Sequence, residues 1–236
     1  MQIAAAKRMV ARSIAAGRSA LSEYDSKRFL AAYGVPVTRE RLVNTAQEAR
    51  AVADRIGYPV VLKGCAYDLM HKTEAGLVMI GLTSGKEVVD ALKTLKSNAG
   101  TDFSGGFLVQ EMVKGDRELM IGMVRDDQFG PSVMFGLGGI FTEVLEDVAF
   151  RLAPLKQSDA RQMMSEIRAA KILASVRGMA RVDRAALARA IVAVGNAAAD
   201  NPDIAEIDIN PLIVSGSRPV AVDGLVVLKP MGGNDG

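Results

Sequence analysis

The first residue with a chemical signature is Lys63, which ends the apolar run Pro-Val-Val-Leu at 59–62 and precedes Gly64. Such a run predicts a short buried strand. An ammonium that leaves a buried strand beside a pliable stretch suits a nucleotide phosphate, because a compact positive charge neutralises the phosphate at close range. A solvated lysine at a strand end is the alternative.

The single histidine, His71, lies in the sequence Leu-Met-His-Lys-Thr-Glu-Ala-Gly at 69–76. Glycines and polar residues without clear periodicity predict a mobile loop over 64–76. A neutral imidazole can accept a phosphoryl group, and Lys72 would offset the charge of that group. A lone histidine is also often structural or solvated, so both interpretations stay open on the residues alone.

A third candidate site lies near the C-terminus, in the sequence Glu-Ile-Asp-Ile-Asn at 206–210. Strict alternation places Glu206, Asp208 and Asn210 on one face of a strand. Burying three such side chains without a cation is costly, and Mg²⁺ with nucleotide phosphates is the natural occupant. Asp223 can join them from an adjacent strand. The polar outer face of an edge strand remains the alternative, and Pro211 is compatible with it.

Two further segments are ambiguous. The glycine cluster Gly-Leu-Gly-Gly at 136–139 can present backbone N–H groups to an anion, or can form a tight hairpin turn. The run Val-Gln-Glu-Met-Val at 109–113 resembles a hinge whose backbone groups bind adenine, and it also resembles an ordinary core strand.

The elements that must position these residues form two groups. Helices are predicted at 3–16, 24–33 with Ser22 as N-cap, 45–57 behind the capping box Thr-Ala-Gln-Glu, and from 86 onward, with strands at 59–63 and 77–82. From Phe107 the pattern becomes strand-rich, and short turns predict an antiparallel sheet. Its strands are expected at 107–113, 117–125, 131–136, 204–209, 212–215 and 219–228, with helices opened by Ser158 and Asp183.

The predicted fold class is therefore α+β with two α/β lobes. The smaller lobe spans residues 21–106 and carries the histidine loop. The larger lobe combines residues 1–20 with 107–228 and carries the strands of the metal site. Residues 229–236 are expected to form a disordered tail.

Composition narrows the function classes. Among 236 residues the net charge is only +2, without a basic run, so neither nucleic acid nor an anionic membrane is an expected partner. No apolar run is long enough to span a membrane. The single cysteine, Cys65, excludes an internal disulfide, and we expect a cytoplasmic protein.

The motifs follow one another in an order that identifies a family. The sequences His-Lys-Thr-Glu at 71–74, Gly-Leu-Gly-Gly-Ile-Phe at 136–141, Phe-Arg-Leu-Ala-Pro-Leu at 150–155 and Asp-Ile-Asn-Pro-Leu at 208–212 lie in the stretch from about Ile14 to Leu228. Together they resemble the ATP-grasp β subunit of ADP-forming acetate–CoA ligase. This enzyme belongs to the NDP-forming acyl-CoA synthetase superfamily, which is related to the succinyl-CoA synthetase β subunit.

The resemblance implies an ATP-grasp fold with ATP or ADP and Mg²⁺ bound between the lobes. It implies an enzyme, an acid–thiol ligase that converts acid, CoA and ATP to acyl-CoA, ADP and phosphate. The acyl chemistry would belong to a separate CoA-binding α subunit, in an α2β2 assembly. In this branch of the family the histidine that matches His71 carries phosphate between the sites of the two subunits.

The resemblance also assigns roles to individual residues. Lys63 would contact the nucleotide phosphates, Glu111 and Val113 would lie at the adenine hinge, and Glu118 would lie near the ribose or the triphosphate. The metal ligands would be those of the C-terminal strands, namely Asp208, Asn210 and Asp223.

One residue departs from the family pattern, because the position of the second glycine after the histidine holds Leu77. Two alternative functions also stay open. One is a non-catalytic nucleotide-sensing regulatory subunit, and the other is a freestanding ATP-grasp carboxylate–amine ligase. Neither the acyl group nor the choice between adenine and guanine nucleotides follows from the sequence.

Overall fold

The computed structural model describes residues 2–67, 75–139, 147–176 and 178–230. The chain divides into two compact units. Unit 1 contains residues 1–21, 25–37 and 113–236, and unit 2 contains residues 22–24 and 38–112. Unit 2 is thus largely an insertion between two parts of unit 1. Each unit has its own hydrophobic core.

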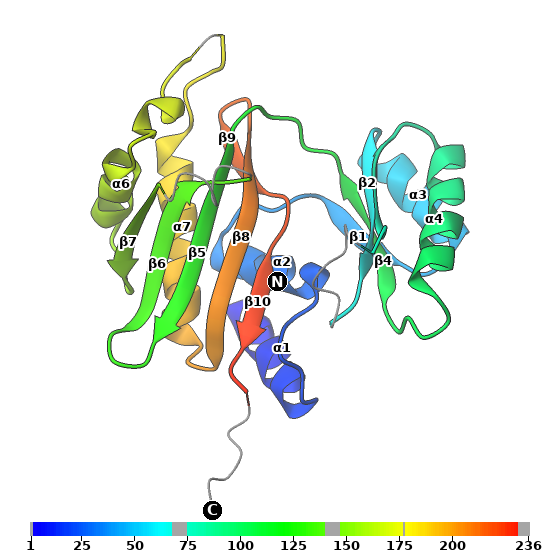
Figure 1. Cartoon of the computed structure of the whole chain (residues 1–236), viewed down its shortest axis with the longest axis horizontal. Helices are drawn as coiled ribbons and strands as arrows, with labels where there is room; N and C mark the ends of the chain where they lie inside the picture. The colour runs from blue at the N-terminus through cyan, green and yellow to red at the C-terminus, as the bar shows by residue number, and fades with distance from the viewer. Residues whose placement is uncertain (1, 68–74, 140–146, 177, 231–236) are drawn as a thin grey trace, which may run out of the picture. The chain divides into compact units, whose positions relative to one another are not determined.

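Unit 2 is a four-stranded antiparallel sheet with two helices. The strand order is β1-β4-β2-β3, with β1 at Glu40–Val43, β4 at Gly106–Glu111, β2 at Val60–Cys65 and β3 at Val78–Leu82. Helices α3 (Ala46–Ile56) and α4 (Gly85–Ala99) pack against each other and contact β4 and β2 (Figure 1).

The sequence explains both helices of unit 2. The hydroxyl of Thr45 accepts the N–H of Glu48, whose carboxylate accepts the N–H of Thr45, so the predicted capping box is confirmed. Ser84 caps α4 by accepting the N–H of Glu87. Each helix buries one apolar face, and Leu92 and its neighbours meet the core-facing side chains of β2.

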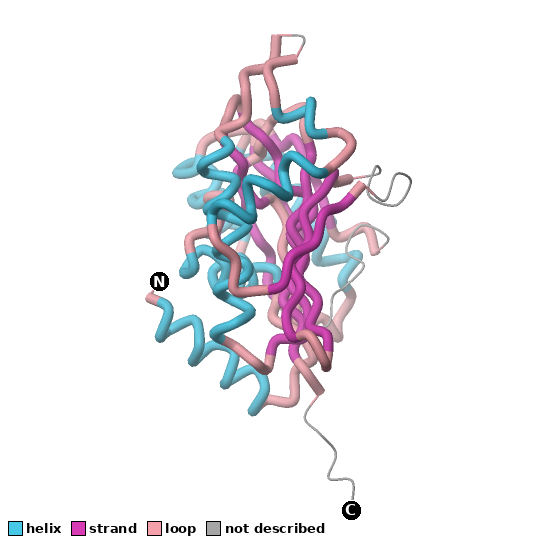
Figure 2. The backbone as a smooth tube through the Cα atoms, turned by 90° about the vertical axis from the view of Figure 1, so that its left-hand side faces the viewer, coloured by secondary structure: helices cyan, strands magenta, loops and turns pink. Residues whose placement is uncertain are grey.

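Unit 1 is built on a six-stranded antiparallel sheet. Its order is β10-β8-β5-β6-β7 with β9 paired to β8, and the strands are β5 (Glu118–Asp126), β6 (Gly130–Leu137), β7 (Val148–Leu152), β8 (Ile204–Ser215), β9 (Arg218–Ala221) and β10 (Leu225–Leu228). The helices are α1 (Ile3–Ala15), α2 (Glu23–Tyr33, whose first residues are counted with unit 2), α6 (Gln157–Glu166), the short 3₁₀ helix η1 (Ala170–Leu173) and α7 (Arg184–Asp200). Helices α6 and α7 lie along one face of the sheet (Figures 1 and 2).

The strands of unit 1 alternate between core and open face. Ile207 and Ile209 of β8 are buried in the core together with Leu119 and Ile121 of β5. The small residues of α7 allow the helix to lie close to its neighbours. At Gly195 a Cβ atom would come within 2.4 Å of the Leu155 Cδ1 atom, so a larger residue there would require the Leu155 side chain to move. The opposite face of the sheet is open, with the polar side chains of β8 and the exposed Phe150 and Leu152 of β7.

The compact units differ from the expected lobes of 21–106 and 107–228 in two places. Strand β4 belongs to unit 2, because it pairs along its length with β1 and β2. Residues 25–37 belong to unit 1, because Phe29, Leu30 and Val35 join the core of the large sheet.

Three further expectations need correction. The segments 204–209 and 212–215 form one continuous strand, β8. Pro211 lies where the pairing of β8 with β5 shifts register, so a backbone N–H for the inter-strand hydrogen bonds is not needed at this position. Ser158 does not cap α6. The helix begins one residue earlier, and the Asp159 carboxylate accepts the N–H of Lys156. Strands β1 and β7 were not expected.

Within the described residues, no helix is both long enough and apolar enough to cross a membrane.

Candidate functional site

Lys63 lies on the central part of the unit 2 sheet, in a strand paired on both sides. It stands opposite Val78 of β3 and Leu108 of β4. Val60 and Leu62 face the helices, so the alternation of β2 places Lys63 on the other face. Its side chain is only 9% exposed, and its Nζ donates to the Glu23 Oε1 atom at 3.0 Å. The alternative of a solvated strand-end lysine is therefore wrong.

Glu111 ends β4 and is held by Arg39. Its carboxylate accepts the backbone N–H of Arg39 at 2.8 Å and the Nε–H of the same residue at 2.7 Å. Its own N–H donates to the Arg39 carbonyl, and the N–H of Met112 donates to the Pro59 carbonyl. The predicted hinge is thus a firmly anchored strand end, followed by the half-buried Val113.

The open face of β8 carries the predicted acidic cluster. Glu206, Asp208 and Asn210 alternate with core isoleucines, as the sequence predicts. Asp208 is opposite Leu225 of β10, and the chain reaches β10 through Asp223. Burial first, and then the negative charges of Glu206 and Asp223, raise the pKa of Asp208 to about 6. The cluster therefore holds more negative charge than its surroundings stabilise.

The glycine loop of unit 1 is tied to this cluster. The N–H of Gly139 donates to the Asn210 Oδ1 atom at 3.0 Å, and the N–H of Gly138 donates to the Glu118 carbonyl at 2.9 Å. A Cβ atom on Gly139 would lie 2.2 Å from the Glu118 Oε2 atom, and Gly139 has a φ of +63°. These two N–H groups are engaged by the protein. The loop thus orients Asn210 and Glu118. The N–H groups of Gly138 and Gly139 are not available to bind an anion, as one interpretation of the sequence had suggested.

The donor chemistry of the cluster fits Mg²⁺. Carboxylate and amide oxygens are hard ligands, and a cation would relieve the repulsion that raises the pKa of Asp208. Among the described residues, no group of three or more His, Cys, Asp and Glu side chains is placed to hold a metal ion. Mg²⁺ is commonly bound by one or two carboxylates, with phosphates and water completing the shell.

His71 lies outside the described residues, and the structure therefore says nothing about its side chain. The residue that departs from the family pattern is described. Leu77 is buried in the core of unit 2, and its carbonyl accepts the N–H of Gly64 at 2.8 Å. Leu77 therefore anchors the chain directly before β3.

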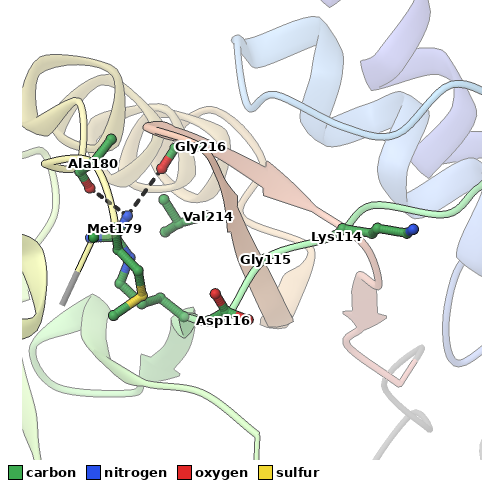
Figure 3. A pocket seen from close by; sticks show the side chains of 9 residues that line it. Lys114, Gly115, Asp116, Met179, Ala180, Val214 and Gly216 are labelled. Atoms are coloured by element: carbon green, nitrogen blue, oxygen red, sulfur yellow. Dashed lines mark hydrogen bonds between the residues drawn. The ribbon is translucent and has the colours of Figure 1, made fainter. Parts of the chain in front are cut away.

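Arg117 is a residue whose importance sequence reasoning missed. It is among the largest fully buried side chains of the protein, and its guanidinium donates to four backbone carbonyls at 2.7–3.3 Å. Two of these bonds, to Ala180 and Gly216, are drawn in Figure 3. A surface pocket of about 420 Å³ adjoins it, lined by residues 114–117, 178–180, 214 and 216. None of the residues predicted to bind nucleotide or metal lines this pocket.

Glu23 was missed as well. Nothing in its local sequence marks it, because its partner Lys63 is 40 residues away along the chain. Arg117 offers a weak signal, since a charged residue at the start of an apolar strand needs partners once it is buried.

Comparisons with known proteins identify close relatives. A family model described as an ATP-grasp domain matches residues 12–228. The chain is 40% identical over 231 residues to the β subunit of ADP-forming acetate–CoA ligase I from Pyrococcus furiosus, covering 96% of this chain and 99% of that subunit. It is also 40% identical over 201 residues to an ADP-forming 4-hydroxybutyrate–CoA ligase from Nitrosopumilus maritimus, covering 84% of this chain but only 29% of that longer protein.

A solved structure agrees with these relatives. The chain superimposes on one chain of the dinucleotide forming acetyl-coenzyme A synthetase 1 from Candidatus Korarchaeum cryptofilum with a TM-score of 0.85 and 39% identity, covering 95% of this chain and 100% of that one. That structure contains coenzyme A and Mg-AMPPCP, and its phosphohistidine segment points towards the nucleotide-binding site.

Proposed function

The chain belongs to the ATP-grasp family that includes the β subunits of ADP-forming acetate–CoA ligase, and on this premise we propose that it is the nucleotide-binding component of an ADP-forming acyl-CoA synthetase. The family and the fold predicted from the motifs are both confirmed. The reaction is acid + CoA + ATP ⇌ acyl-CoA + ADP + phosphate. Identity over nearly the whole length of a ligase subunit favours this function over a regulatory subunit or an amine ligase.

The observation that carries the proposal is the acidic cluster of unit 1. Asp208 lies on the open face of the sheet, Asp223 precedes β10 and is close enough to raise the pKa of Asp208, and Asn210 is oriented by Gly139. We assign these three residues to Mg²⁺ and place Glu118 near the ribose or the triphosphate. When bound, Mg²⁺ neutralises charge on the phosphates and so favours transfer of the terminal phosphoryl group.

The remaining nucleotide contacts come from unit 2 and from Val113, which is counted with unit 1. We assign Lys63 to the phosphates, because a buried ammonium on a sheet face is a fixed positive charge in a place that water screens poorly. Glu111 and Val113 form the adenine hinge. The bonds from Arg39 fix the carboxylate of Glu111, so Glu111 serves to hold the hinge strand in place.

We assign His71 as the phosphate acceptor. In the proposed step an imidazole nitrogen attacks the γ-phosphorus of ATP, the bond to the bridging oxygen breaks, and ADP leaves. Direct transfer requires reacting atoms about 3–3.5 Å apart, so chemistry on two polypeptides calls for a carrier. The acyl chemistry then belongs to a CoA-binding α component, and we expect an α2β2 assembly. A cytoplasmic location fits this role and a chain that has a single cysteine.

The experiment compares His71→Asn with Lys63→Met in the presence of an α component. His71→Asn should bind MgATP as the wild type does and lose all turnover, because it removes a chemical step. Lys63→Met should weaken MgATP binding itself. Acid-labile ³²P should appear on the wild-type chain from γ-labelled ATP and be absent from His71→Asn. Wild-type turnover by His71→Asn would rule out the carrier role, and failure of the wild type to bind millimolar MgATP would rule out the function.

A further inference from the structure

We propose that Glu23 is a positioning residue for the nucleotide phosphates, because its carboxylate holds the Lys63 ammonium in place on β2. The inference rests on the proposed role of Lys63. It adds to the nucleotide site a residue from the first turn of α2, a segment far from β2 in the sequence.

The geometry of the pair separates it from the other ion pairs of unit 2. Lys63 Nζ and Glu23 Oε1 are 3.0 Å apart, with side chains 9% and 2% exposed. Both residues belong to unit 2. Among the described residues of the same unit, the pair Lys93–Asp90 has side chains 71% and 56% exposed. Exposed pairs of that kind contribute little, whereas a pair removed from water depends on its partner.

Burial makes the carboxylate necessary for the position of the charge on Lys63. A buried ammonium that loses a carboxylate partner is unfavourably placed, and the side chain can relieve this by turning towards solvent. The positive charge would then move away from this face of β2. The bond to the Glu23 carboxylate opposes that movement.

The start of α2 suits this role. Glu23 is the first residue of an 11-residue helix, where the positive end of the helix dipole stabilises a negative charge. An ammonium has three N–H donors, so bonding to Glu23 is compatible with donating to a phosphate oxygen. The helix, the carboxylate and the ammonium thus form a chain of opposite charges that ends at the predicted phosphate contact.

The test measures binding of MgATP and of adenosine to the full-length chain by calorimetry. Glu23→Gln keeps the size of the side chain and an acceptor oxygen while it removes the charge. It should weaken MgATP binding by about tenfold or more and leave adenosine binding unchanged, since only ATP carries phosphates. Glu23→Asp keeps the charge one methylene further away and should restore part of the loss. Asp90→Asn, which removes an exposed carboxylate of the same unit, should change neither ligand.

A double-mutant cycle completes the design. In the Glu23→Gln/Lys63→Met protein, ATP binding should equal that of Lys63→Met alone, because the proposed effect of Glu23 on the phosphates passes through Lys63. If Glu23→Gln does not fold, the double variant should fold, because it lacks both charges, and Glu23→Asp then decides the question through its ratio of ATP to adenosine affinity.

Three results would overturn the inference. They are unchanged MgATP binding in a folded Glu23→Gln protein, an equal loss for adenosine and ATP in either Glu23 variant, and a full additional loss on the Lys63→Met background. If the wild-type chain itself fails to bind MgATP, the proposed function fails first, and this outcome is distinct from the other three.

Discussion

Replacing Asp208 with asparagine should stabilise the protein while it removes Mg²⁺ binding. The folded protein raises the pKa of this carboxyl from an ordinary 3.8 to about 6. A raised pKa on an acid means that the folded state binds the proton more tightly than the unfolded state does. Stability is therefore lost as the pH rises from about 4 through about 6, and at pH 7.5 the ionised Asp208 opposes folding.

The size of the effect follows from the same pKa. A rise from 3.8 to about 6 corresponds to an upper limit of about 3 kcal/mol, at about 1.4 kcal/mol per pH unit. Asp208 is only half-buried, so relaxation and water reduce this to about 1–3 kcal/mol. Asparagine has nearly the same shape and removes the charge, and at about 2–4 °C per kcal/mol the variant should melt several degrees higher.

The assay is thermal and denaturant unfolding without divalent cations from pH 4.5 to pH 8. The advantage of Asp208→Asn should be small at pH 4.5 and grow through pH 6. Asp127→Asn, which removes an exposed carboxylate from the turn between β5 and β6, is the matched control and should show no such trend. With MgATP the order should invert, since only the wild type gains stability from the ligand. A variant less stable than the wild type at pH 7.5, or a gap that does not depend on pH, would refute the reasoning.

Two further predictions concern unit 1. Gly139→Ala should raise the Mg²⁺ concentration needed for half-maximal activity by about tenfold, because a Cβ displaces Glu118 and disturbs the bond to Asn210. Gly130→Ala introduces the same left-handed strain at φ +79° with nothing within 4 Å, so it should leave the Mg²⁺ requirement unchanged, and equal shifts in both variants would contradict the assignment. Arg117→Met should lower the free energy of unfolding by about 3–5 kcal/mol in denaturant titrations, because four backbone carbonyls lose a charged donor; a loss below 1 kcal/mol would show that these bonds are not needed.

Local signals in the sequence predicted most of the elements. The capping box at Thr45 and the Asp183 cap act over three residues, so both helices began where expected. Strand β7 was not predicted from the sequence. Its apolar residues Phe150 and Leu152 are exposed on the open face, so the alternation of apolar and polar residues that marks a half-buried strand is missing. Because of Pro211 we expected a strand to end there, but a register shift in the pairing of β8 with β5 allows β8 to continue through it.

The part of the candidate site that lies on a single strand could be predicted from the sequence. The period of two placed Glu206, Asp208 and Asn210 on one face, because side-chain direction in a strand depends on local geometry alone. The contacts of Lys63 and Arg117 could not be predicted in this way. Their partners are separated from them by 40 residues or more, and only the packed fold brings them together.

The division of α2 between the compact units bears on how this protein can be dissected. A fragment of residues 38–112 would contain all four strands and both helices of unit 2, yet it would leave Glu23 behind. Lys63 would then lack the carboxylate of Glu23, and we expect the fragment to be less stable although its sheet and helices are complete. Unit 2 is therefore not a module that can be excised as one continuous segment of the chain. Transplanting it into another scaffold requires residues 22–24 as a separate piece, supplied as a peptide or by permuting the chain.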